Sequence, residues 1–150
     1  MPGISARPGR AGLVNSGLLL ALVLPLAAGC YWLRYHDLAR THAELIEDLS
    51  AAALASVEAS ERPLAPGEIE RLRYPLARAR EFTDIARKRY ADRPSLLALD
   101  ALVARYADLV AALERARVEP PDVPALRALV ADVDQRADAV RAAIDREEAG

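Results

Sequence analysis

The sequence predicts an all-α protein, and three observations carry the prediction. Alanine, leucine and arginine supply 32, 23 and 19 of the 150 residues, and these residue types lose little free energy on entering a helix. Apolar residues recur at steps of three and four, which is the period of an amphipathic helix. One Phe, one Trp and scattered Val and Ile leave little material for a β-sheet. We therefore expect an N-terminal hydrophobic signal or anchor segment, followed by a three- or four-helix up-and-down bundle.

Residues 1–29 are the expected hydrophobic segment. They contain no Asp or Glu and carry Arg7 and Arg10, and an uncharged run extends from Ala11 to Leu33. A basic start, a short apolar centre and a small-residue end are the layout of a secretory signal peptide. This segment therefore directs the chain to a membrane.

The residues that end this segment, Leu26-Ala27-Ala28-Gly29-Cys30, resemble the lipobox of bacterial lipoproteins. The resemblance covers only the first thirty residues, and Ala27 stands where the family most often has leucine. In that family the signal is cut before the cysteine, whose thiol is joined to diacylglycerol. The resemblance implies that Cys30 is a lipid-attachment site. Each buried methylene of an acyl chain contributes about 0.8 kcal/mol, so two or more chains hold a protein firmly to a bilayer.

An uncleaved membrane anchor is the alternative interpretation. The uncharged run of 23 residues could cross a hydrocarbon core of about 30 Å as a helix. Tyr31, Trp32 and Tyr35 would then form an aromatic belt at the membrane interface. A plain cleaved signal and a buried cytosolic helix are further alternatives. Lipoprotein and anchor both predict that residues 31–150 lie on the extracytoplasmic, periplasmic side of the cell envelope.

Residues 30–150 form the expected extracytoplasmic helical domain. Prolines and capping residues divide it into helices at about 31–61, 68–90, 94–118 and 123–148. The third helix has the clearest apolar pattern. The connections between the last three helices are only a few residues long, so these helices should run antiparallel as neighbours.

Several local features refine this division. Residues 62–67 contain two prolines and a glycine and are expected to form a loop. Asp92 and Asp122 are candidate helix caps because each precedes a helical pattern. Pro75 lacks a backbone N–H, so we expect a kink just before it or a new helix that starts there.

The composition leaves few candidates for chemistry. One cysteine and two histidines exclude a disulfide framework and multi-cysteine metal sites. His36 and His42 are about 120° apart on a helix, so we expect solvated or interfacial side chains and no metal site. The acidic residues of the fourth helix lack a calcium-loop pattern, and pairs such as Asp132 with Arg136 indicate a solvated face. We expect no catalytic residues, no cofactor and no enzymatic activity.

Charge and aromatic residues also bear on partners. The net charge of −2 argues against nucleic-acid binding. The basic run from Arg78 to Arg89 is interleaved with acids and is interpreted as a charged helix face, with a partner-binding strip as the alternative. Tyr74, Tyr90 and Tyr106 are expected at the edge of the core with their hydroxyls in water.

The resulting functional hypothesis is a membrane-tethered extracytoplasmic interaction or structural protein of the bacterial envelope. Its expected partners are membrane lipid, reached through Cys30 or the apolar segment, and a protein partner or a second copy of itself. Two alternatives stay open. One is a sensing bundle that holds an apolar ligand near Phe82, Ile85, Tyr106 and Val110. The other is a single-span subunit of a membrane complex.

Overall fold

The computed structural model describes the backbone of residues 11–60 and 62–150, and the side chains of Trp32, residues 34–60 and residues 62–150. The described chain is helical without strands, which confirms the all-α class. The helices are α1 (Ala11–Ser60), α2 (Pro66–Tyr90), α3 (Pro94–Arg115) and α4 (Val123–Ala149). The chain divides into two units, Met1–Tyr35 and His36–Gly150, and the bundle is the second of them.

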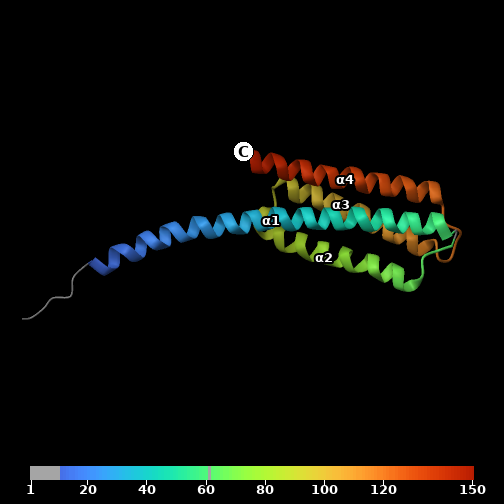
Figure 1. The fold of residues 1–150 in the computed structure, drawn as a ribbon, viewed down its shortest axis with the longest axis horizontal. Helices are drawn as coiled ribbons and strands as arrows, with labels where there is room; N and C mark the ends of the chain where they lie inside the picture. The colour runs from blue at the N-terminus through green and yellow to red at the C-terminus, as the bar shows by residue number, and fades with distance from the viewer. Residues whose placement is uncertain (1–10, 61) are drawn as a thin grey trace, which may run out of the picture. The chain divides into compact units, whose positions relative to one another are not determined.

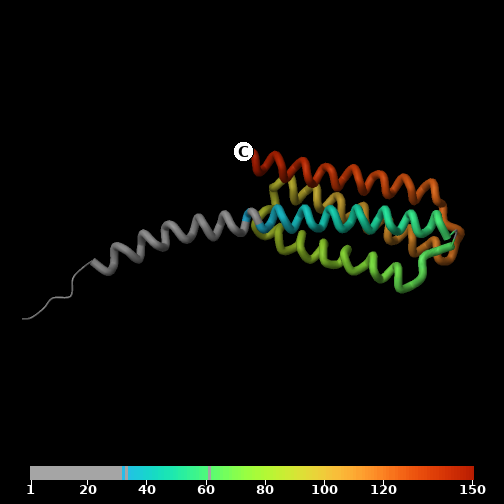
Figure 2. The backbone as a smooth tube through the Cα atoms, in the orientation of Figure 1, coloured from blue at the N-terminus to red at the C-terminus, as the bar shows by residue number. Residues whose placement is uncertain are grey.

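The bundle of His36–Gly150 consists of α2, α3, α4 and the part of α1 from His36 onward (Figure 1). Successive helices run in opposite directions, as the tube in Figure 2 shows. Ion pairs join α1 to α4, α2 to α3 and α3 to α4, and a ring contact joins α1 to α2. Each helix therefore has two neighbours, which makes a closed four-helix up-and-down bundle.

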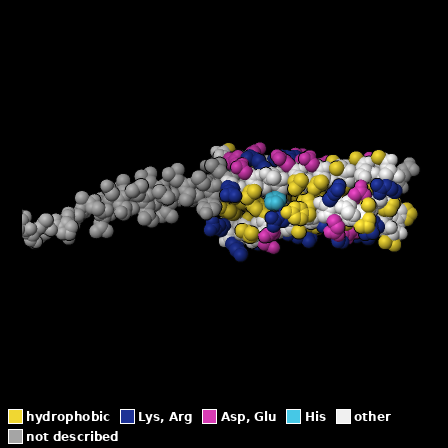
Figure 3. All heavy atoms as spheres, turned by 60° about the horizontal axis from the view of Figure 1, so that its bottom comes forward, with side chains coloured by type: hydrophobic (Ala, Val, Ile, Leu, Met, Phe, Trp, Pro, Cys, Tyr) yellow, Lys and Arg dark blue, Asp and Glu magenta, His cyan; other side chains and the backbone are white. Residues whose placement is uncertain are grey.

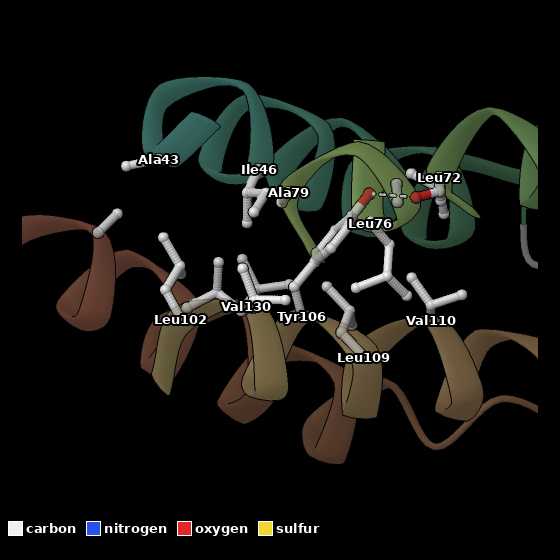
Figure 4. Packing of buried hydrophobic residues seen from close by; sticks show 14 of the residues in the cluster. Ala43, Ile46, Leu72, Leu76, Ala79, Leu102, Tyr106, Leu109, Val110 and Val130 are labelled. Carbon is white, nitrogen blue, oxygen red and sulfur yellow. Dashed lines mark hydrogen bonds between the residues drawn. The ribbon is translucent and has the colours of Figure 1, made fainter. Parts of the chain in front are cut away.

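The core is built by apolar residues at helical spacing on all four helices (Figure 4). Helix α3 contributes the most large side chains, and α1 contributes mainly small ones. The fully or nearly fully buried members include Ala43, Ile46, Leu72, Ala79, Leu99, Leu102, Tyr106, Leu109, Leu113, Leu126, Val133, Val140 and Ile144. This pattern follows the apolar periodicity of the sequence, because each stripe faces the inside of the bundle.

The helix ends agree with the expected ones to within a few residues for α2, α3 and α4. Asp122 caps α4, since its side chain accepts a hydrogen bond of 3.0 Å from the backbone N–H of Ala125. Asp92 does not cap α3: the capping position is Arg93, and Pro94 opens the helix. The expected loop at 62–67 is too long, because Pro66 and Gly67 already belong to the first turn of α2. Proline fits there because the first-turn N–H groups have no partner within the helix.

Pro75 does not start a new helix. Helix α2 is continuous from Pro66 to Tyr90 with Pro75 inside it, although proline leaves the carbonyl group four residues earlier without its usual donor. The ring of Pro75 is buried, and packing of this kind can offset the cost of an interior proline. Next to this turn, the hydroxyl of Tyr106 donates to the carbonyl oxygen of Leu72 at 3.0 Å.

Candidate functional site

The residues expected at the membrane are Cys30, Tyr31, Trp32 and Tyr35, and the structure describes the side chains of Trp32 and Tyr35 among them. The side chains of Cys30 and Tyr31 are outside the described residues. The rings of Trp32 and Tyr35 stack with centroids 5.6 Å apart, and Tyr35 is 4% exposed. In the part of the chain whose side chains are described, no helix carries a stretch long and apolar enough to cross a bilayer.

A cluster of charged side chains holds α1, α3 and α4 together where the bundle begins. We call it the junction cluster, and its members are His36, Arg40, Ser95, Asp145, Glu147 and Glu148. His36 is fully buried, with Nε2 at 3.0 Å from Glu147 Oε2 and Nδ1 at 3.2 Å from Glu148 Oε1. Ser95 donates to Glu147 twice, through its backbone N–H at 2.9 Å and its hydroxyl at 2.8 Å. Glu147 thus links the first turn of α3 to the first bundle residue of α1.

The electrostatics of the junction cluster favour its charged carboxylates. Burial raises the pKa of Glu147, but the hydrogen bonds from Ser95 and His36 outweigh it and leave the pKa below its usual value. The hydrogen bond from Arg40 lowers the pKa of Glu148. The pKa of Arg40 is raised by its hydrogen bonds to Glu148 and Asp145. The charges of the cluster therefore stabilise one another, and they hold α1, α3 and α4 together.

The two histidines differ from what the sequence predicts. The expectation of a solvated or interfacial side chain is wrong for His36, because its carboxylate partners come from a helix more than a hundred residues away. His42 is half-buried, in agreement with the prediction, and its ring lies 5.0 Å from that of Phe82. Burial, aided by the nearby charge of Arg78, lowers the pKa of His42.

An apolar strip lies on the surface along the line where α1 meets α2. It consists of Leu38, His42 and Leu45 from α1 and Phe82 and Ile85 from α2. Leu38, Leu45 and Ile85 are 40%, 42% and 60% exposed. Figure 3 shows hydrophobic side chains beside a histidine that reaches the surface, with charged side chains around them. Single exposed apolar residues are ordinary, but a contiguous group of this kind is typical of an interaction surface.

The acidic residues of α4 act as ion-pair partners. The predicted pair of Asp132 with Arg136 is confirmed at 3.1 Å, and Asp132 also forms an ion pair with Arg105 of α3. Burial, with repulsion from Glu47 and Asp138, raises the pKa of Asp134. The described residues contain no group of three or more His, Cys, Asp or Glu side chains arranged to hold a metal ion.

Much of the basic run in α2 is paired. Arg78 contacts Glu81 at 2.7 Å, and Arg87 contacts Asp84 at 2.8 Å and Asp100 of α3 at 2.9 Å. These contacts confirm a charged helix face in this part of α2. Two of its members, Arg78 and Lys88, nevertheless remain on the exposed surface near the apolar strip.

The tyrosines and the proposed ligand site are only partly as expected. Tyr74 is exposed as predicted, but Tyr106 is fully buried with its hydroxyl on the Leu72 carbonyl group, so the prediction for Tyr106 is wrong. Burial raises the pKa of Tyr106 above its ordinary value. Ile85 faces solvent while Tyr106 lies in the core, so the residues named for an apolar ligand site do not line one space.

Comparison with known proteins gives no relative for this chain. No family model, no curated protein and no solved structure matches it. The functional interpretation therefore rests on the residues and contacts described above.

Proposed function

We propose that this chain is a membrane-tethered helical interaction protein of the bacterial envelope, anchored by lipid on Cys30. The sequence supports the tether through its basic start, its apolar run and the lipobox-like residues before Cys30. A single-span anchor that keeps residues 1–29 is the alternative. In both cases residues 31–150 face the extracytoplasmic side.

The junction cluster is the structural observation that best supports a tethered role. Only five residues separate Cys30 from His36, where the bundle unit begins. A tether at Cys30 would therefore be close in sequence to the first residue of the bundle. His36 and Arg40 fasten α1 to α4 at this point, and Glu147 carries the connection to α3. A buried charge network of this kind specifies one arrangement of helices, because a broken partner leaves a charge without compensation.

The interaction role is supported by the apolar strip. Leu38, Leu45 and Ile85 are exposed together on one surface, and a contiguous exposed apolar group is typical of an interaction surface. The strip lies on the surface of two helices whose core-facing residues pack inside the bundle. A partner could contact Leu38, Leu45 and Ile85 there without displacing a core residue.

The intact mass of the full-length protein, extracted with detergent from a bacterial host, tests the tether. We expect the mass of residues 30–150 plus acyl chains. Cys30→Ser should abolish the added mass and leave the signal uncut, whereas Ala27→Leu, which restores the commonest lipobox residue, should be processed at least as well.

The other masses have distinct meanings. An unmodified chain that keeps residues 1–29 would contradict the lipoprotein and favour the single-span anchor. A cleaved chain without acyl groups would contradict both forms of tether.

A further inference from the structure

The apolar strip is bordered by opposite charges on its two helices. On α1, Asp37, Glu44 and Asp48 recur at steps of seven and four and therefore share one exposed face. On α2, the exposed cations beside the strip include Arg78 and Lys88. We call these residues the acidic edge and the basic edge. The strip thus has acids along its α1 side, and along its α2 side it has Lys88 and Arg78, of which Arg78 also contacts Glu81.

The acidic edge is not neutralised within the bundle. Among the described residues, no cation lies within ion-pair distance of Asp37, Glu44 or Asp48, and no carboxylate lies within that distance of Lys88. In contrast, the charges between α1 and α4 and between α2 and α3 form close pairs. Asp37, Glu44, Asp48 and Lys88 are therefore available to pair with charges of a partner.

A partner for this surface needs apolar side chains flanked by charges in the reverse order. A second copy of this chain, turned by 180°, presents that pattern, because its α2 then faces α1 of the first copy. Two-fold interfaces are self-complementary in this way, and each contact occurs twice. Complementary charges at the rim of such an interface set its orientation and suppress other arrangements.

The heights of the charged residues along the bundle also match. His42 lies beside Phe82, and the two helices are antiparallel. Asp37 is five residues before His42, and Lys88 is six residues after Phe82, so they lie within about 1.5 Å of the same level. Arg78, four residues before Phe82, lies at a level between Glu44 and Asp48. A two-fold axis along the bundle preserves these levels and brings each acid opposite a base of the other copy.

We propose that two copies of this chain associate side by side, in parallel, through the apolar strip, with the acidic edge of each against the basic edge of the other. The parallel orientation rests on the proposed tether, because two chains anchored in one membrane face the same way. Confinement to a membrane also raises the effective concentration of the copies for each other.

Sedimentation equilibrium of the full chain in density-matched detergent tests the apolar contact. Leu45→Glu should weaken the dimer about tenfold or more, since Leu45 enters the interface from both copies. Leu97→Glu, on α3 and 57% exposed, is the matched control and should leave the dimer unchanged. A wild-type chain that stays monomeric, or a dimer unaffected by Leu45→Glu, would overturn the proposal.

A charge swap tests the orientation. Asp37→Lys and Lys88→Asp should each weaken the dimer by about three- to tenfold, because each reversal places like charges together twice. The double variant should restore it, while circular dichroism shows that all variants stay folded. Loss of the dimer without rescue in the double variant would overturn the parallel pairing.

Cross-linking in the membrane separates this proposal from the tether. Copies carrying Asp37→Cys and copies carrying Lys88→Cys are co-expressed with different tags and treated with a short bis-maleimide. We expect a mixed dimer that neither copy forms alone, with the wild-type chain and its Cys30 as control. If the mass measurement contradicts the tether and the mixed dimer still forms, the association stands; if the tether is present and no mixed dimer forms, the association fails.

Discussion

Helices α1 and α3 both lie between α2 and α4, but they are held in the bundle by different means. Helix α3 buries large side chains, namely Leu96, Leu99, Leu102, Val103, Tyr106, Leu109, Val110 and Leu113. The core residues of α1 are smaller, with Ala39, Ala43, Ile46, Ala53 and Val57. Alanine buries little apolar area, so hydrophobic burial stabilises α3 much more than α1.

Ion pairs add to the limited hydrophobic packing of α1. They run along its contact with α4 from His36 with Glu147, through Glu47 with Arg141 at 2.7 Å, to Glu58 with Arg127 at 2.5 Å. Hydrogen bonds to Glu47 and Asp138 raise the pKa of Arg141. Each exposed pair contributes little stability, but the positions of the pairs specify the register of α1 against α4. Helix α3 thus supplies most of the hydrophobic stability, and α1 depends on charge pairs for its register.

The largest effect should come from truncation of the α3 core. Leu102→Ala removes a fully buried side chain and leaves a cavity, so it should lower the free energy of unfolding by about 2–5 kcal/mol. Leu97→Ala, on the exposed side of the same helix, should change it by less than about 0.5 kcal/mol. Denaturant titration measures both. Equal losses in the two variants would contradict the central role of α3.

A smaller effect should come from the junction cluster. Glu147→Gln removes the charge that faces His36 and weakens the hydrogen bonds from Ser95, so it should cost about 1–3 kcal/mol. Because the folded state lowers the pKa of Glu147, its contribution is present above the ordinary glutamate pKa of 4.5 and is lost as the pH falls through the lower folded value.

Stability measured between pH 7 and pH 3 checks this prediction. The wild-type protein should lose more stability on acidification than Glu147→Gln does. Glu119→Gln is the control, since Glu119 is exposed in the turn between α3 and α4 and lies outside the ion pairs of the described bundle, and it should follow the wild type. Parallel curves for wild type and Glu147→Gln would show that the cluster does not stabilise the fold.

The pair at the other end of the contact between α1 and α4 should matter least. Glu58→Gln should lower the free energy of unfolding by about 0.2–1 kcal/mol, because Glu58 and Arg127 are both substantially exposed. Salt screens such a pair, so the difference from wild type should shrink at 1 M NaCl. A salt-independent loss would indicate that the side chain acts through packing.

His42 should give a small pH effect of its own. The folded state lowers the pKa of His42, so the unfolded chain binds more protons near and below the ordinary value of 6.5, and stability falls as the pH decreases through that range. His42→Gln should flatten this part of the curve. Thermal melts at pH 7.5 and pH 5.5 measure it, and an unchanged slope in the variant would exclude His42 as the source.

The positions of the helices could be predicted because local signals decide them. Prolines open α2, α3 and α4, and Asp122 caps α4 as expected. The burial pattern of α3 follows directly from its apolar period. Of the two alternatives at Pro75, a new helix start is wrong, because a proline in a helix can be tolerated when packing fixes the surrounding turn, and that packing is a tertiary property.

The side-chain contacts of the junction cluster, of Tyr106 and of the apolar strip could not be predicted to the same extent. By sequence, His36 is expected to be solvated or interfacial and Tyr106 to lie at the edge of the core with its hydroxyl in water. Their partners, Glu147 and the Leu72 carbonyl group, come from distant parts of the chain and are brought near only by folding. The apolar strip was missed for a related reason. Leu38 and Leu45 fit the period of a core face, and only the packing of α1 against α2 shows that they lie at its exposed margin.

The up-and-down order of the helices decides where a reporter or an epitope can be attached to the bundle. Because His36 lies beside Glu147, whatever is joined to Gly150 begins at the same end of the bundle where α1 enters it. A bulky reporter at Gly150 would therefore crowd His36 and the other residues of the junction cluster. The turn between α3 and α4, residues 116–122, is at the opposite end and largely exposed. A short epitope inserted there would lie at the far end of the bundle from His36 and leave the junction cluster intact.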